Sequence, residues 1–202
     1  MNATVLNMGL HGFGCDRNVQ LALNTIRRIG ALSGVYHTPA TTPEGYPIRK
    51  ITDVLAAIHK QAPAARIYLA GYPHLFGSSP STFRHAGYAP SRYACTLAFG
   101  TVGSLSVRVE IDYADAQFLN NMADTLDGAL RYGVSQAVKA GVPATYVEVR
   151  GIFTEHGLCD AGTPWIQTLL LNPDNSSMSG SFHPLAAGQQ AYETAFARVL
   201  AP

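Results

Sequence analysis

The stretch SGSFHPLAAG, residues 179–188, places His183 in a Ser/Gly-rich loop just before a predicted helix. An imidazole can move protons near neutral pH and can activate a serine hydroxyl for attack. Packing alone gives a histidine no reason to lie in such a loop, so one hypothesis is a proton carrier presented at the mouth of a site. The alternative, which position alone leaves open, is a surface or packing histidine.

Two further stretches combine an imidazole with a thiol, HGFGC at residues 11–15 and HGLC at residues 156–159. Zinc takes nitrogen and sulfur ligands in tetrahedral sets, so a metal-dependent hydrolase is one hypothesis. It would use His11, Cys15, His156 and Cys159. Neither pair is a C-x-x-C, and the spacings match no usual zinc pattern. We therefore expect no metal and no other cofactor, and we expect these cysteines to pair or to be buried.

The glycine-rich stretch GLHGFG, residues 9–14, follows a predicted strand. It contains neither G-x-G-x-x-G nor a following Gly-Lys-Ser/Thr, so it does not predict a phosphate cradle. Backbone N–H groups from Gly9 to Gly12 either donate to a developing oxyanion or form a plain tight turn.

Trp165 is the only tryptophan. It either lines a substrate cleft near His183 or covers the core.

Composition limits the class of protein that can carry these residues. The 202 residues are 47% hydrophobic and 13% charged, which predicts a single domain over 1–202 with a packed core. A net charge of +1 without runs of like charge argues against nucleic acid as a main partner. No apolar stretch is long enough to span a membrane. No signal peptide is visible, and because the chain begins almost directly in a strand we expect upstream residues to be missing.

Hydrophobic periodicity and turn residues predict an alternating order of elements. In order these are a strand at 3–9, helices at 16–30 and 48–63, a strand at 65–73, a long surface loop at 74–94, extended chain at 98–111, a helix at 112–140, a strand at 144–150 and a helix at 186–200. This alternation predicts an α/β fold with a parallel sheet covered by helices on both faces. Sites form at the carboxyl ends of such strands, so loops 9–15, 72–80 and 151–183 should converge.

Four stretches at compatible spacing together resemble the secreted actinobacterial branch of the GDSL/SGNH esterase–lipase family. They are APAARIYLAGYPHLFG, LNNMADTLDGAL, TYVEVRGIFTEHGLCDAGTPWI and SFHPLAAGQQAY, and the likeness runs from about Ile48 to Ala197. The resemblance implies a three-layer α/β/α sandwich with a flavodoxin-like parallel sheet. It also implies secretion and hydrolysis of small-molecule or lipid esters without a cofactor.

The resemblance assigns roles to particular residues. His183 matches the histidine that acts as general base in the family. The position three residues earlier is usually Asp and is Gly180 here, whose backbone carbonyl is expected to orient the imidazole instead. Cys159 matches a cysteine that relatives pair with one upstream of the long helix, so a Cys95–Cys159 disulfide and an oxidising compartment are expected. Cys15 then lacks a partner within the chain.

The chain also departs from the family pattern. It contains no Gly-Asp-Ser stretch, which carries the family nucleophile, and NMGLHGF stands where an oxyanion-binding Gly-Gly-Asn-Asp stretch is expected. One interpretation is a truncated or degenerate relative whose missing first strand leaves a sheet edge that a partner could cover. Another is recruitment of a different serine, from Ser78, Ser79, Ser179 and Ser181. The alternative function is an inactive module that binds acyl or carbohydrate ligands, with Trp165 among its contacts.

Overall fold

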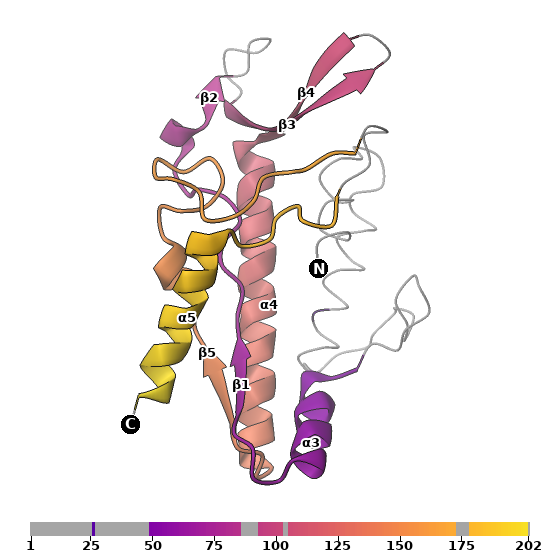
Figure 1. Cartoon of the computed structure of the whole chain (residues 1–202), viewed down its shortest axis with the longest axis vertical. Helices are drawn as coiled ribbons and strands as arrows, with labels where there is room; N and C mark the ends of the chain where they lie inside the picture. The colour runs from indigo at the N-terminus through magenta and orange to yellow at the C-terminus, as the bar shows by residue number, and fades with distance from the viewer. Residues whose placement is uncertain (1–25, 27–48, 86–92, 103–104, 173–177, 202) are drawn as a thin grey trace.

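Two short strands form the centre of the described fold. The computed structural model describes residues 26, 49–85, 93–102, 105–172 and 178–201. Strands β1 (Ile67–Ala70) and β5 (Ala144–Val147) pair in parallel, with Ile67 opposite Ala144 and Ala70 opposite Val147 (Figure 1). Both strands lie where the sequence predicts them. Their carboxyl ends point toward the same end of the molecule, which is where a site is expected.

Helices cover both faces of this parallel pair. Helices α3 (Ile51–Gln61) and α4 (Tyr113–Lys139) lie on one face, and α5 (Ala186–Leu200) lies on the other (Figure 1). Strand residues alternate between the two faces: Leu69 and Tyr146 pack toward α3 and α4, whereas Ala70 and Val147 pack toward α5. The described residues therefore form three layers, α/β/α.

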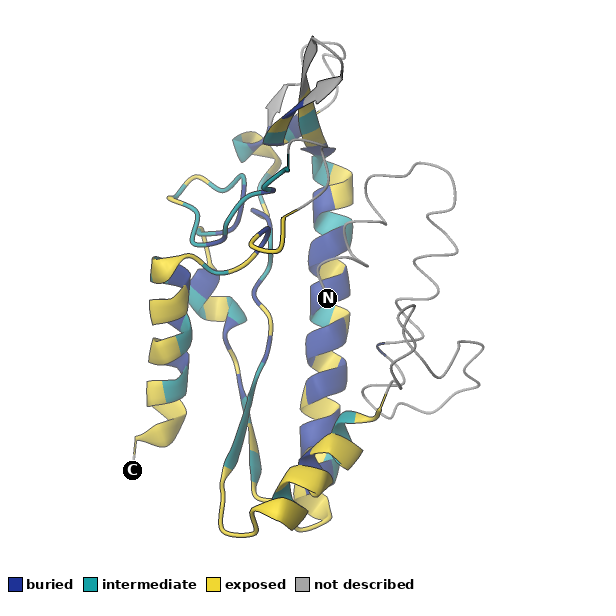
Figure 2. Cartoon of the chain, turned by 45° about the vertical axis from the view of Figure 1, so that its right-hand side comes forward, coloured by how far each residue is buried: buried dark blue, intermediate teal, exposed yellow. Residues whose placement is uncertain are grey.

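The long helix α4 is the main structural support. Asp112 caps its first turn, because the carboxylate accepts a hydrogen bond from the backbone N–H of Asp115 at 2.9 Å. The helix is followed by Gly141 at φ 86°, a left-handed conformation that glycine adopts without strain. A buried stripe runs along it (Figure 2), as the apolar spacing of residues 119–138 predicts, except that Val138 at the end of this range is 48% exposed.

A second, antiparallel sheet stands beyond the carboxyl ends of the parallel strands (Figure 1). It contains β2 (Arg84–His85), β3 (Tyr93–Val102) and β4 (Leu105–Asp112), with a register shift between Thr96 and Ala98. The extended chain predicted at 98–111 is confirmed. The sequence pattern did not predict that this stretch folds back on itself, with β3 and β4 paired in an antiparallel sheet.

The prediction of a surface loop at 74–94 is wrong in part. Phe76 and Phe83 are each only 2% exposed and belong to the largest buried cluster, and a 3₁₀ turn, η1 (Pro80–Thr82), lies between them. Ser, Gly and Pro dominate this stretch and predict a loop, but its two phenylalanine rings pack into the core, where burial of apolar surface is favourable.

Several predictions fall outside the described residues. The strand at 3–9, Gly9, Gly12 and all of the predicted helix at 16–30 except Ile26 lie there. Ile26 is helical and packs against α4 residues Met122, Leu126, Ala129 and Leu130. Among the helices of the described ranges, none is both long and apolar enough to cross a membrane.

Candidate functional site

His183 lies in a tight turn beyond the last parallel strand. The backbone N–H of Ser181 donates to the carbonyl of Met178 at 3.0 Å, and that of His183 donates to the carbonyl of Gly180 at 3.3 Å. Ser181 and Phe182 are buried, whereas His183 is exposed. The turn therefore buries the two residues before the histidine and presents the histidine itself at the surface.

A short antiparallel ladder holds the backbone around His183. The carbonyl of His183 accepts from the N–H of Gln167 at 2.8 Å, and the carbonyl of Gln167 accepts from the N–H of Phe182 at 3.0 Å. The N–H of Leu185 donates to the carbonyl of Trp165 at 2.8 Å. Because both sides of the turn are bonded to the segment that follows Cys159, the position of His183 is fixed by non-local contacts.

Phe182 adopts a strained backbone conformation, with φ at 61°. A left-handed conformation costs a residue with a side chain about 1–2 kcal/mol. Its ring packs edge-on to that of Phe76, with centroids 6.4 Å apart, and is only 8% exposed. Burial of the ring offsets the strain, and such strain is concentrated at functional sites.

Asn120 of α4 clamps the loop that carries Phe76. Its Oδ1 accepts from the backbone N–H of Phe76 at 3.2 Å, and its Nδ2 donates to the carbonyl of the same residue at 2.8 Å. Asn120 is 2% exposed within the apolar face of α4. This positioning residue was missed from sequence, where the only available signal was an amide inside the apolar stripe.

Helix α5 begins close to the His183 turn because Gly188 has no side chain. A Cβ at Gly188 would lie 2.4 Å from the backbone carbonyl oxygen of Trp165 and 3.0 Å from Cβ of Pro184. The first distance is shorter than a side chain tolerates, and the second is tight enough that Pro184 would have to shift slightly. Gly188 therefore allows the first turn of α5 to approach the backbone ladder.

Trp165 is half-buried in an aromatic group. Its indole stacks on the ring of His156, with centroids 3.6 Å apart and an interplanar angle of 6°, and meets Phe153 edge-on. Nδ1 of His156 lies 2.9 Å from the carbonyl oxygen of Thr163. These contacts place Trp165 over the packed core, while its backbone pairs with Leu185 beside His183.

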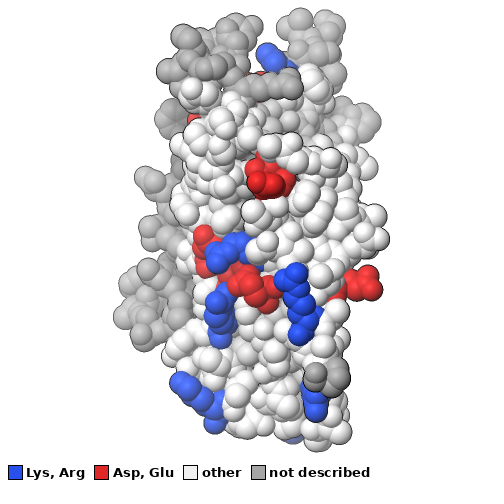
Figure 3. Space-filling view, turned by 90° about the vertical axis from the view of Figure 1, so that its left-hand side faces the viewer, with Lys and Arg blue, Asp and Glu red and all other residues white. Residues whose placement is uncertain are grey.

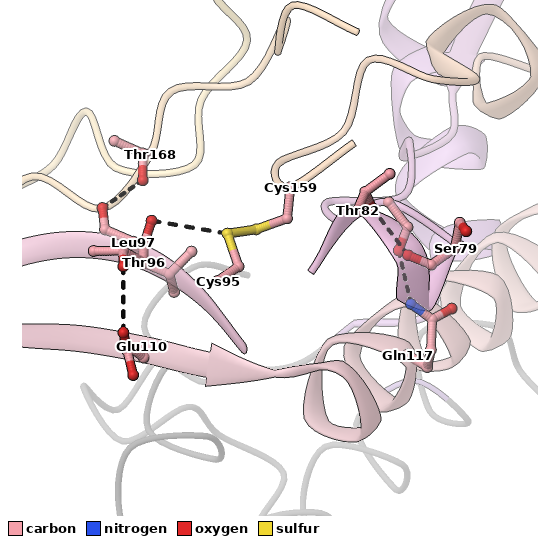
Figure 4. Close-up of a disulfide and its surroundings, with 10 residues drawn as sticks. Ser79, Thr82, Cys95, Thr96, Leu97, Glu110, Gln117, Cys159 and Thr168 are labelled. Atoms are coloured by element: carbon pink, nitrogen blue, oxygen red, sulfur yellow. Dashed lines mark hydrogen bonds between the residues drawn. A yellow bond between two sulfur atoms is a disulfide. The ribbon is translucent and has the colours of Figure 1, made fainter. Parts of the chain in front are cut away.

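The predicted disulfide between Cys95 and Cys159 is confirmed. It joins β3 to the loop that follows β5, with the two Cα atoms 6.0 Å apart (Figure 4). A disulfide cysteine supplies no thiolate, so Cys159 is removed from the hypothetical metal site. His11 and Cys15 lie outside the described residues. Within the described ranges, no three His, Cys, Asp or Glu side chains are grouped as metal ligands would be.

The serines considered as nucleophiles occupy different environments. The hydroxyl of Ser181 is buried, accepts from the N–H of Leu170 at 2.9 Å and donates to the carbonyl of Leu170 at 3.2 Å. Ser79 caps η1, where its hydroxyl accepts from the N–H of Ser81. Ser78 and Ser179 are exposed. The backbone contacts of Ser181 and Ser79 give their hydroxyls structural roles, which disfavours both as nucleophiles.

A charged network that the sequence did not predict lies between α4 and the carboxyl end of β5. His74 Nε2 lies 2.8 Å from Asp124 Oδ1, Arg150 contacts the same carboxylate, and Arg131 contacts Glu148. Acidic and basic side chains gather on one face of the molecule (Figure 3). The pKa of Asp124 is lowered below its ordinary value. Burial alone would raise this pKa, but the hydrogen bonds and charges of His74 and Arg150 outweigh the effect of burial.

Asp127, almost one turn further along α4, has the opposite environment. It is 3% exposed, and its Oδ1 accepts from the N–H of Tyr72 at 2.8 Å, just beyond β1. Burial raises the pKa of Asp127, and the Tyr72 N–H and the Tyr146 hydroxyl offset only part of this effect. Burial likewise raises the pKa of Tyr146. The hydrogen bond from Tyr72 connects α4 to the end of β1 and indicates a structural role for Asp127.

Comparison with solved structures establishes the fold. The chain is similar to the extracellular lipase of Streptomyces rimosus, at 19% identity and a TM-score of 0.57, and to phospholipase A1 of Streptomyces albidoflavus NA297, at 18% identity and a TM-score of 0.56. The alignments cover 96% and 97% of this chain and 62% of each neighbour's chain. No family model matches the chain, and neither does any curated protein. The predicted three-layer α/β/α fold is thereby confirmed, and the chain spans about 62% of the length of the two neighbours.

Proposed function

We propose that this chain belongs to a carboxylic ester hydrolase that acts on lipid esters, with His183 as its general base. The observation that carries the proposal is the position of His183. It is exposed in a turn beyond the last parallel strand, on a fold shared with an extracellular lipase and a phospholipase A1. Ligands of open α/β sheets bind at this end of the strands.

The proposed chemistry is acyl transfer to a serine followed by hydrolysis. The serine Oγ forms a bond to the acyl carbonyl carbon while His183 takes the hydroxyl proton, and the carbonyl π electrons move to the oxygen. The tetrahedral intermediate then collapses, the ester C–O bond breaks, and the leaving alcohol takes the proton from His183. Water repeats the sequence on the acyl-enzyme and releases the acid. Backbone amides at Gly9 and Gly12 are the proposed oxyanion donors.

Gly180 is the proposed positioning residue for the imidazole. Its carbonyl already accepts the backbone N–H of His183 at 3.3 Å, which brings the two residues together across the turn. A carbonyl oxygen has two lone pairs, so it can accept a second hydrogen bond from the imidazole. This would supply the orientation that an Asp provides at the same position in the family that the sequence resembles.

We also propose that the protein works outside the cytoplasm. Disulfides persist in oxidising compartments, and Cys95–Cys159 is a long-range bridge that spans 64 residues of sequence. The structural neighbour from Streptomyces rimosus is an extracellular enzyme. Both observations support secretion, as the sequence resemblance implies.

Hydrolysis of p-nitrophenyl butyrate by the full chain tests the enzyme proposal. His183→Ala should reduce kcat/KM by at least about 10⁴-fold, as loss of the base does in serine hydrolases. His59→Ala is the matched control, because this histidine lies on α3, which packs near the amino end of β1 (Figure 1), and it should leave the rate unchanged. A fluorophosphonate label, mapped by mass spectrometry, would identify the nucleophilic serine.

Background rates in both the wild type and His183→Ala, with no phosphonate label on any serine, would overturn the enzyme proposal. The absence of a Gly-Asp-Ser stretch and the structural use of the Ser181 and Ser79 hydroxyls favour the second candidate in that event. That candidate is an inactive module that binds acyl or carbohydrate ligands. Direct binding measurements would then replace the ester assay.

A further inference from the structure

An apolar hollow of about 490 Å³ lies between β3 and the segment that pairs with the His183 turn. Its walls are residues 95–99 of β3 and residues 168–171, with Leu158, Cys159 and Pro164 between them. Cys95 and Cys159, which the disulfide joins, both line it. Figure 4 shows this disulfide between β3 and the loop that follows β5. Its volume falls within the range of small-molecule sites, about 300–1,000 Å³.

The lining of the hollow suits a hydrocarbon rather than a polar ligand. None of its lining residues is charged. Two carry hydroxyls, and both hydroxyls have protein partners: Thr168 donates to the carbonyl of Leu97, and Thr96 donates to Glu110 at 3.4 Å (Figure 4). A sugar or headgroup placed here would lose its hydrogen bonds to water without replacing them, which is costly.

Leu170 connects the hollow to the proposed catalytic turn. It lines the hollow, and its Cδ1 would lie 3.4 Å from a Cβ built on Gly180. Its N–H donates to the hydroxyl of Ser181, two residues before His183. The hollow therefore borders the turn that carries His183.

Phe99 extends the apolar wall beyond the rim. It lines the hollow and is 72% exposed, on a strand pair that projects from the body of the molecule (Figure 1). A ring that is this exposed and continuous with an apolar cavity would gain burial from a bound hydrocarbon. The exposed ring and the uncharged walls favour the same class of ligand.

We propose that this hollow binds the alkyl chain of a fatty acyl ester and directs its carbonyl to the His183 turn. The inference rests on the proposed function for the ester, but alkyl binding itself needs no catalysis. Each methylene that enters the hollow should tighten binding about fourfold, which corresponds to about 0.8 kcal/mol of transfer free energy. The gain should stop when the hollow is full.

Calorimetric titration of the full chain with saturated fatty acids from butanoate to dodecanoate tests this binding site. Affinity should rise about fourfold per methylene and then level off. Ala98→Phe places a ring in the hollow and should weaken decanoate binding by at least about tenfold. Ala57→Phe, the same change at an exposed position of α3, should bind decanoate as the wild type does.

Circular dichroism would check the fold of each variant, and Leu171→Phe fills the hollow from the opposite wall if Ala98→Phe does not fold. In the wild type, a diazirine analogue of decanoate should label residues 95–99 or 168–171. Labels confined to other segments, or decanoate affinity unchanged in the filled variants, would overturn the proposal. Normal decanoate binding without ester hydrolysis would instead reject the proposed function alone.

Discussion

The strand–helix body and the loop region are stabilised by different sets of contacts. The body consists of β1, β5, α3, α4 and α5, and it is held by apolar clusters on both faces of the parallel strands. The loop region, residues 150–185, contains Glu155, Cys159 and Phe182, which are the non-glycine residues with positive φ in the described part of the chain. Among the described non-glycine residues, positive φ therefore occurs in the loop region, where it includes Phe182 next to His183, and not in the body.

The restraints in the loop region differ in kind as well. A disulfide, a backbone ladder and the buried hydroxyl of Ser181 hold it, in addition to an apolar cluster that includes Phe153, Leu158, Ile166, Leu169 and Phe182. Such restraints fix a geometry that local preferences do not favour. The two regions should therefore respond differently to the same kind of change.

Removing the disulfide should have the largest effect. The Cys95→Ser/Cys159→Ser double variant removes a disulfide with a sequence separation of 64. Its loss should lower the free energy of unfolding by about 4 kcal/mol. Hydrogen exchange should show that amide protection falls first in residues 157–170 while α4 stays protected. Equal loss of protection in α4 at low denaturant would contradict the separation into two regions.

Two glycine-to-alanine changes form a matched pair. Gly188→Ala should lower the free energy of unfolding by about 1–3 kcal/mol, because the added Cβ meets the Trp165 carbonyl. Gly128→Ala, in α4 with nothing within 4 Å, should raise it by about 1 kcal/mol through helix propensity. Urea unfolding measures both. If both variants changed the free energy of unfolding in the same direction, the contact between α5 and the ladder would not restrict the side chain at position 188.

Two carboxylates of α4, Asp127 and Asp124, should give the body opposite dependences of stability on pH. The folded pKa of Asp127 is raised above its ordinary value of 3.8, so its ionisation lowers wild-type stability as pH rises through that window. Asp127→Asn cannot ionise and should gain stability relative to the wild type between acidic and neutral pH.

The matched control is Asp124→Asn. The folded pKa of Asp124 is depressed, so the wild type gains stability above the unfolded pKa and loses it as pH falls through the folded pKa. This variant should therefore lose stability relative to the wild type as pH rises. Urea midpoints across the acidic range measure both slopes, and slopes of the same sign would disprove the assigned environments.

Sequence patterns predicted the body well. Apolar spacing gave the helices now observed at Ile51–Gln61, Tyr113–Lys139 and Ala186–Leu200, and short apolar runs gave the two parallel strands. Resemblance to the GDSL/SGNH family added the fold and the Cys95–Cys159 bridge, both of which are confirmed. The roles of His183 and Gly180 remain predictions.

Tertiary structure alone decided the surroundings of the proposed site. The ladder between residues 165–170 and 181–185, the buried hydroxyl of Ser181, the Asn120 clamp and the apolar hollow join segments that are distant in sequence or irregular. Helix and strand periodicity records which face of a segment is buried, and the sequence contains that information locally. It does not record which irregular segment packs against which, because those choices depend on the apolar burial and hydrogen bonds gained only when the whole chain has folded.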